Sequence, residues 1–486
     1  MNKAKLFIEN FFVYGLGGII SKIIPLIMVP IITRLMPTTE YFGISDMSQT
    51  IISFASALAI IGMYDAMYRM YFEKDDEQYK KTVCSTTLIF TIVMSIVVFI
   101  LMIIFREQLA KWFLGNKDFA YIIFLSATAT LVSATNSIIS APTRMQNKRK
   151  VFLIANTVSP LISYGISIPL LLNGYYTIAL PLAGVISGIT MEVAFYVMNR
   201  KWFLPKLFDK KLLKQLLVIA IPLFPNFLIY WIFNSSDRLM ITNLIGVGAE
   251  GIYAVGSKLG HASQLIYTAF AGGWQFFAFS TMKEKDQVQS NSNIFEYLGI
   301  ISYIATAFVC AFSFWIFRLL FDEEYLEGYI IAPYLFLAPL LLMLFQVASN
   351  QFLVIKKTWP NMFILLSGAL LNIILNLVLI PAIGIEGASV ATLAGYIVSD
   401  IIAVIVLCKM KLMTVSKRFL LVSSCMALYF IVWRFFITKN TIAGLGLAVI
   451  FTIVCIIFYK KELIMIIKKI KTKNRDKTSN YNNSVQ

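Results

Sequence analysis

The sequence is poor in the residues with which soluble proteins build polar and metal-binding sites. Only 14% of its 486 residues are charged, whereas 59% are hydrophobic. It has one histidine, His261, which excludes a His-rich metal centre, and its five cysteines form no C-x-x-C pair. Neither a disulfide framework nor a thiolate metal site is therefore expected. We expect a chain with no metal, no cofactor and no soluble catalytic domain.

Long hydrophobic runs, by contrast, recur along the whole chain and are separated by short polar turns. A helix needs about 20 mainly apolar residues to cross a hydrocarbon core of about 30 Å. The pattern therefore predicts an all-α integral membrane protein with about 14 transmembrane helices. The predicted spans are 11–35, 44–68, 82–104, 119–140, 151–172, 177–198, 214–235, 250–280, 294–317, 331–354, 361–380, 387–408, 418–437 and 442–459.

Acidic residues are also scarce, with 25 Asp and Glu against 42 Lys and Arg, and the net charge is +17. An even number of spans places both termini on one side of the membrane. If that side is the cytoplasm, 32 Lys and Arg lie in cytoplasmic segments and 8 at the opposite ends, with Lys22 and Lys258 inside spans. This bias agrees with the positive-inside rule. We expect a multi-pass protein of the plasma or inner membrane, with cytoplasmic termini and no nucleic-acid partner.

A faint internal repeat predicts how the helices are grouped. The turn after the first span contains Glu40 and Gly43, and the turn after the seventh contains Glu250 and Gly251. Each turn follows a span with two prolines and an arginine. We expect six-helix lobes at 1–205 and 206–410 around a central cavity, two additional helices at 411–459, and a basic cytoplasmic tail at 460–486. Parallel repeats place the substrate between the lobes, and the tail suits anionic lipid.

Short motifs spread over the chain carry a family resemblance. They are Tyr14-Gly15, Pro30-x3-Arg34-Leu35, Glu40-Tyr41-Phe42-Gly43, Tyr68-Arg69-x-Tyr71-Phe72, Ser236-Asp237-Arg238, Gly251-Ile252-Tyr253 and Pro381-x2-Gly384-Ile385-x-Gly387-Ala388. The chain resembles the polysaccharide flippases (O-antigen, capsule and exopolysaccharide) of the multidrug/oligosaccharidyl-lipid/polysaccharide exporter superfamily.

The resemblance implies a fourteen-helix transporter and no enzymatic activity. Such a protein would flip undecaprenyl-diphosphate-linked oligosaccharide from the inner to the outer leaflet by alternating access, for cell-surface polysaccharide biosynthesis. Its partners would be this lipid-linked substrate, membrane lipids and other polysaccharide-assembly proteins. We expect the chain to act as a monomer.

Two lysines inside predicted spans, Lys22 and Lys258, are the sharpest candidates for the substrate cavity. A charge at the bilayer centre costs about 2.5–3.5 kcal/mol on insertion scales, so it normally faces protein or a wet cavity. The expected substrate carries a diphosphate of about −2, and lysine serves as a point charge for phosphate. The alternative for both lysines is a structural ion pair or snorkelling to an interface.

Polar residues at helical spacing line one face of several spans. Gln49 belongs to such a face in the second span, and His261 and Gln264 belong to one in the eighth. Hydrogen-bonded helix packing is the alternative explanation for these faces. For the eighth span we favour a wet cavity, and the three side chains join the lysines as cavity candidates.

Five charged residues near span ends are candidates for a gate or rim. Arg34 and Arg238 are expected near the outer rim, in corresponding places of the two lobes. Asp237 adjoins Arg238, and Asp65 with Arg69 closes the inner end of the second span. Helix capping and anchoring to headgroups explain such residues equally well.

Two other functions compete with a flippase. A cation-coupled multidrug exporter of the same superfamily would want buried carboxylates; Glu192 and Asp400 are candidates, although we prefer an interface-anchor role for them. A membrane enzyme is disfavoured because the chain has no long outer loop, D-x-D motif or His/carboxylate set. Residues 251–258 imitate a phosphate-binding P-loop but end in Gly-Ser-Lys, so ATP hydrolysis is not expected.

Overall fold

The computed structural model describes residues 23–282, 284–357, 359–462 and 464, and these residues form helices and turns without a strand. The prediction of an all-α membrane protein is confirmed. The helices in the first half are Ile23–Arg34, α2 (Thr39–Ile60), α3 (Met63–Tyr71), α4 (Glu77–Ile104), α5 (Arg106–Leu114), α6 (Ala120–Met145), α7 (Arg149–Leu172), α8 (Ala179–Asn199) and α9 (Lys210–Ala220). The others are α10 (Phe224–Leu244), α11 (Val247–Gly260), α12 (Gln264–Ser280), α13 (Gln287–Leu320), α14 (Gly328–Val354), α15 (Trp359–Ile383), α16 (Ile385–Lys409), α17 (Lys417–Val432) and α18 (Thr441–Phe458).

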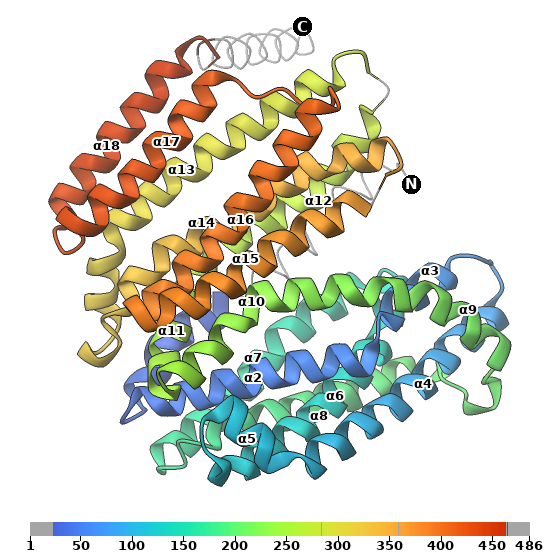
Figure 1. Cartoon of the computed structure of the whole chain (residues 1–486). Helices are drawn as coiled ribbons and strands as arrows, with labels where there is room; N and C mark the ends of the chain where they lie inside the picture. Colours follow the sequence, from blue (N-terminus) through green and yellow to red (C-terminus); the bar gives the residue numbers. More distant parts are fainter. Residues whose placement is uncertain (1–22, 283, 358, 463, 465–486) are drawn as a thin grey trace, which may run out of the picture.

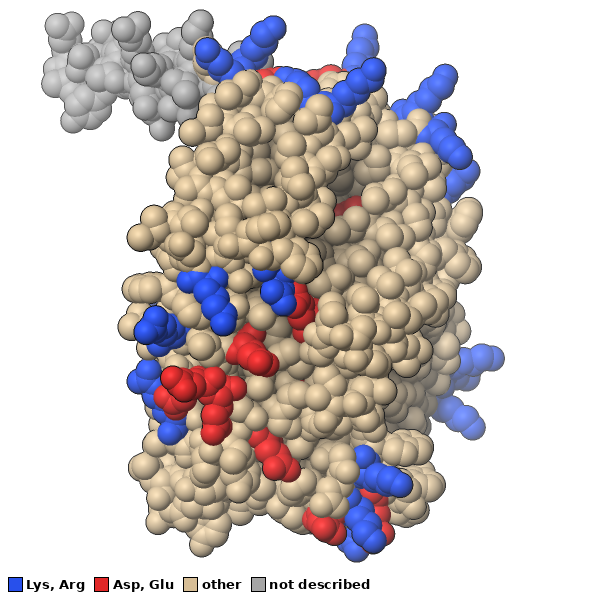
Figure 2. Space-filling view, turned by 60° about the vertical axis from the view of Figure 1, so that its left-hand side comes forward, with Lys and Arg blue, Asp and Glu red and all other residues tan. Residues whose placement is uncertain are grey.

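A helix lies at every predicted span, although not every span is one straight helix. Among the described residues, ten helices are long and apolar enough to cross a membrane, or up to 12 if each of two bent pairs is one span. The two other predicted spans are 11–35, of which only part is described, and 250–280, which is divided into α11 and α12. Figure 2 shows the corresponding surface, on which uncharged residues cover most of the molecule and Lys and Arg gather along the upper edge.

The two bent pairs have identifiable causes in the sequence. α2 and α3 meet at an angle of 49°. Between them Gly62 has a φ of +73°, and a Cβ atom there would lie 2.6 Å from the Ala220 carbonyl oxygen. The second pair, α9 and α10, is joined through Pro222 and Pro225, which remove backbone donors and favour a kink.

The helices form two groups, which Figure 1 shows one above the other. The first group comprises α2 to α8, in which α6 packs on α2, α4 and α8. The second group comprises α10 to α16, in which α14 packs on α11, α13 and α16. Helix α9 packs on α3 and α4 of the first group before the chain bends into α10. The groups meet at the starts of α2 and α11, and their helices diverge toward α3 and α12 (Figure 1).

Helices α17 and α18 lie against the outside of the second group (Figure 1). Tyr429 donates a 2.9 Å hydrogen bond to the Ala307 carbonyl, and Trp433 donates one of 2.9 Å to the Cys310 carbonyl, both on α13. At the other end, Glu296 of α13 accepts bonds from the Ser416 amide (2.6 Å) and the Tyr459 hydroxyl (2.9 Å). These bonds attach both ends of the α17–α18 pair to α13 of the second group.

Candidate functional site

A close crossing of two helix starts joins the groups. A Cβ atom on Gly43 of α2 would lie 2.1 Å from the Val247 carbonyl oxygen. Likewise, a Cβ atom on Gly251 of α11 would lie 2.0 Å from the Thr39 carbonyl oxygen. Only glycine permits such an approach of two helix backbones, as in other small-residue crossings in membranes. We call this end of the molecule the crossing end.

Four charged side chains lie just beyond this crossing, and we call them the charge cluster: Asp46, Arg238, Glu250 and Lys258. Asp46 of α2 is 5% exposed and forms ion pairs with both Arg238 of α10 and Lys258 of α11. Arg238 also donates to the Ser257 hydroxyl at 3.0 Å and lies 3.9 Å from the fully buried Glu250 carboxylate. An acidic side chain of the first group therefore lies between two cations of the second.

The surroundings of the charge cluster explain why the crossing end is closed. Removing one partner of a buried ion pair costs about 3–5 kcal/mol because it leaves a charge without compensation. The Lys258 ammonium also lies 5.0 Å from the centre of the Phe42 ring, and its side chain is 33% exposed. Lys258 is thus the member of the cluster that solvent or an entering ligand reaches most easily.

Aromatic packing and two hydrogen bonds also hold the crossing end together. Phe42 packs edge-on against Tyr325, with ring centres 6.3 Å apart. Arg34 donates a 3.2 Å hydrogen bond to the Leu319 carbonyl of α13, and Asn243 of α10 donates one of 2.6 Å to the Trp112 carbonyl of α5. The crossing end is therefore closed by backbone contact, ion pairs and side-chain packing together.

A second polar network, which we call the Asp237 network, lies inside the second group. Asp237 accepts a bond from the Tyr253 hydroxyl and lies 3.5 Å from the Thr392 hydroxyl. Asn372 donates to that hydroxyl at 3.0 Å and accepts from the Asn376 amide at 3.3 Å. One carboxylate surrounded by amide and hydroxyl oxygens suits a hard cation. The described residues contain no cluster of three or more His, Cys, Asp or Glu that suits a metal.

The candidates from the sequence fall into different places. Lys22 lies outside the described residues. Lys258 and Arg238 come together at Asp46 on the interface of the two groups, and Arg34 binds across the same end. Asp237 instead belongs to the network inside the second group. His261 and Gln264 lie partly buried at the bend between α11 and α12. Asp65 and Arg69 are exposed on α3, which follows the end of α2 opposite the crossing. Gln49 lines a pocket in the first group.

Sequence reasoning missed the partners of Lys258. The sequence shows Asp46 as a polar residue of the second span and Glu250 as part of a turn, but neither was assigned a role in the site. A signal was available, because opposite charges follow the two matching glycines: Asp46 after Gly43, and Lys258 after Gly251. If the repeat brings the glycines together, it also brings the charges within reach of each other.

The pocket around Gln49 has a volume of about 550 Å³ and lies between α2, α6, α7 and α8. Hydroxyl and amide side chains make up much of its wall, and none of the described residues that line it is charged. Hydrogen-bonding groups without a net charge suit the hydroxyls of a neutral sugar. The polar residues that line it are Gln49, Ser133, Asn136, Ser137, Ser159, Ser163, Tyr164 and Ser187.

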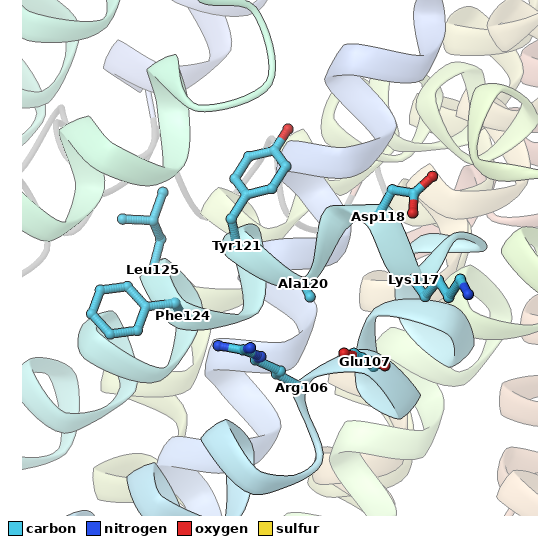
Figure 3. Close-up of a pocket in the computed structure, with 8 residues that line it drawn as sticks. All are labelled: Arg106, Glu107, Lys117, Asp118, Ala120, Tyr121, Phe124 and Leu125. Atoms are coloured by element: carbon cyan, nitrogen blue, oxygen red, sulfur yellow. The ribbon is translucent and has the colours of Figure 1, made fainter.

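A further pocket, of about 680 Å³, lies where α5 meets the start of α6 (Figure 3). Figure 3 shows Arg106 and Glu107 on one side of it and Lys117 and Asp118 on another. All four side chains are exposed to solvent, where ionic interactions contribute little. This pocket contains no member of the charge cluster, and we do not assign the function to it.

Comparisons of the sequence with known proteins identify a family and a relative. The family described as "Polysaccharide biosynthesis protein" matches residues 7–281. An uncharacterized membrane protein of Methanocaldococcus jannaschii, MJ1375, is 22% identical over 396 residues, which cover 78% of this chain and 93% of that protein.

Solved transporters share the fold. The lipid II flippase MurJ in an inward closed conformation superimposes with a TM-score of 0.72 at 17% identity, covering 93% of this chain and 100% of that one. An inward-facing multidrug resistance MATE family transporter of the MOP superfamily gives 0.55 at 14% identity, covering 81% and 98%. At such identities the similarity establishes the fold alone.

Proposed function

Because the chain belongs to the polysaccharide biosynthesis protein family, we propose that it flips a diphosphate-linked lipid oligosaccharide across the plasma membrane by alternating access. The charge cluster carries this proposal. It contains two cations, Arg238 and Lys258, held by an acidic residue of the other helix group. A diphosphate headgroup can replace Asp46 as their partner, since arginine and lysine both bind phosphate oxygens strongly.

The exchange of partners would couple binding to movement. An anionic headgroup that reaches the partly exposed Lys258 competes with Asp46 and removes one of the ion pairs that close the crossing end. The two helix groups would then rock apart at Gly43 and Gly251. The charge pattern of the turns places the crossing end on the outside, so this opening releases the substrate outward.

The glycan part of the substrate needs partners of another kind. Sugar hydroxyls require hydrogen-bonding groups, and a charged wall would restrict the site to glycans of the opposite charge. The pocket beside Gln49, with its hydroxyl and amide lining, supplies such groups within the first helix group. The lipid tail would remain in the bilayer, which makes the overall substrate a lipid with a bulky polar head.

The test is transfer of a fluorescent undecaprenyl-diphosphate oligosaccharide between leaflets of proteoliposomes. Lys258→Ala should slow transfer by about tenfold or more, since a hydrogen bond to a charged group contributes about 1.5–3 kcal/mol. Lys258→Arg should retain transfer. Lys80→Ala serves as the matched control, because Lys80 near the start of α4 pairs with the exposed Asp75 and contacts no member of the charge cluster. Wild-type rates in the Lys258→Ala variant would contradict the proposal.

The identity of the glycan follows from a second experiment. Deleting the gene should cause one lipid-linked intermediate to accumulate on the cytoplasmic leaflet, and mass spectrometry of that lipid identifies the sugar unit. Unchanged glycan lipids together with altered drug sensitivity would instead favour an exporter of small molecules.

A cation-coupled exporter of the same fold is the second candidate, and the Asp237 network favours it. Its carboxylate, amide and hydroxyl oxygens offer a place for a coupling cation inside the second group. Drug efflux that depends on a sodium or proton gradient, and that Asp237→Asn abolishes, would support this function over the flippase.

A further inference from the structure

An apolar cavity lies on the second helix group, away from the charge cluster. Its volume is about 570 Å³, and its walls come from α13, α14, α16 and α17. Aromatic rings dominate one side, where Tyr303 and Phe419 are stacked with ring centres 6.0 Å apart. The volume falls within the range of about 300–1,000 Å³ found for pockets that hold drug-sized ligands.

One acidic residue, Asp400 of α16, also lines this cavity. Its side chain is more than nine-tenths buried, and neither carboxylate oxygen has a hydrogen-bond partner in the structure. No Lys or Arg is among the described residues that line the cavity. A buried carboxylate without a partner is costly, so its position beside an apolar cavity requires an explanation.

Among the described buried carboxylates, Asp400 alone has neither a hydrogen-bond donor nor a cation within 4 Å; Glu250 also lacks hydrogen bonds but lies 3.9 Å from Arg238. Glu192, which holds the corresponding place in the sequence of the first half, accepts a 2.5 Å bond from Thr135. Glu296 is bound by Ser416 and Tyr459, and Glu386 by Arg434. Each of these carboxylates has a partner on a neighbouring segment of the chain, whereas Asp400 faces the cavity.

The depth of Asp400 limits what can occupy the cavity. It lies nine residues before Lys409, where α16 ends, which corresponds to about 14 Å of helix. The amine of a phospholipid headgroup stays at the interface and does not reach this depth. A lipid tail reaches it but gains nothing from a carboxylate. A positive charge on an apolar body satisfies both the carboxylate and the walls.

We propose that this cavity binds a drug-sized lipophilic organic cation, with Asp400 as its counter-ion. The aromatic rings of Tyr303 and Phe419 add cation–π attraction, which is stronger in desolvated sites. The site is separate from the proposed path of the lipid-linked oligosaccharide. It lies between the second group and α17, the helix that the chain adds beyond its two repeats.

The test compares two probes of the same shape and opposite charge, tetraphenylphosphonium and tetraphenylborate, binding to the full chain in nanodiscs. The wild type should bind the phosphonium, and Asp400→Asn should weaken that binding by about tenfold or more. Glu192→Gln, the matched control, should bind like the wild type. Equal phosphonium binding by Asp400→Asn, or equally tight binding of tetraphenylborate to the wild type, would overturn the proposal, and the second result would identify a plain apolar tail site.

A second variant and a photolabelling experiment distinguish loss of the binding site from misfolding of Asp400→Asn. Ala427→Trp fills the cavity from α17 while Asp400 remains, and it should also abolish phosphonium binding. A photoreactive phosphonium should label residues of α17 in the wild type, and excess tetraphenylphosphonium should prevent that labelling. Labelling that is confined to other helices would overturn the proposal.

Discussion

Asp46 and Asp400 are both buried carboxylates of membrane-spanning helices, but the structure surrounds them differently. Asp46 lies between Arg238 and Lys258, which come from the other helix group. Asp400 lies among the aromatic and aliphatic walls of a cavity and has no hydrogen-bond partner. The first carboxylate joins two helix groups that separate in the proposed transport cycle. The second binds no group of the described protein, and we propose that a ligand pairs with its charge.

The comparison also separates two ways in which a membrane protein tolerates a buried charge. At an interface between helix groups, a partner of opposite charge is supplied by the other group and is lost whenever the interface opens. Within one group the partner must be a permanent neighbour or a bound molecule. Four substitutions test this distinction, in order of expected effect.

The largest effect is expected where the two groups touch. Gly43→Val places side-chain atoms where the Val247 carbonyl oxygen would lie 2.1 Å from the new Cβ atom, so the crossing end cannot close. We expect loss of transport. A cysteine introduced at the buried Ala254 should then react with an impermeant maleimide from outside, in a background without native cysteines. Gly446→Val in α18 is the control, because a Cβ atom there meets nothing within 4 Å.

Asp46→Ala should destabilise the protein by about 3–5 kcal/mol, since it leaves Arg238 and Lys258 close together without an anion. The measurement is the midpoint of thermal unfolding in detergent. Combining it with Lys258→Ala should recover part of the loss, which a double-mutant cycle quantifies. Additive effects of the two substitutions would show that the pair is not coupled.

Arg434→Gln provides the intermediate case. The Arg434 guanidinium binds Glu386 through two hydrogen bonds of 2.6 and 2.8 Å, but its side chain is 32% exposed. Solvent screening reduces the contribution of such a pair, and we expect a loss of about 1 kcal/mol. If the loss equals that of Asp46→Ala, burial at the interface is not what distinguishes the charge cluster.

Asp400→Leu should have the smallest effect on stability, and the change should be neutral or favourable. Replacing an unpartnered buried carboxylate by an apolar side chain removes a desolvation penalty and breaks no hydrogen bond. Thermal unfolding without added ligand is the measurement. A drop in the unfolding midpoint as large as that of Asp46→Ala would reveal a structural partner for Asp400 and end the contrast between the two carboxylates.

The sequence by itself determined the class of the fold and the positions of its helices. Runs of about 20 apolar residues have few alternatives to a membrane-spanning helix, because every backbone polar group must be satisfied inside the segment. Neither bend was predicted, although Pro222 and Pro225 lie at one of them and Gly62 at the other. The two mid-span lysines were recognisable as unusual for the same reason, since a charge in a hydrocarbon environment is costly.

Only the tertiary structure decided which residues meet. Lys258 and Asp46 are separated by 212 positions in the chain, and hydropathy carries no information about which face of one helix packs on which face of another. The pairing depends on the backbone approach at Gly43 and Gly251, which brings α2 and α11 together at one end. The same holds for Asp400, whose lack of a partner follows from the packing of α13, α14 and α17 around it. Burial and proximity are properties of the packed helices, and no window of sequence contains them.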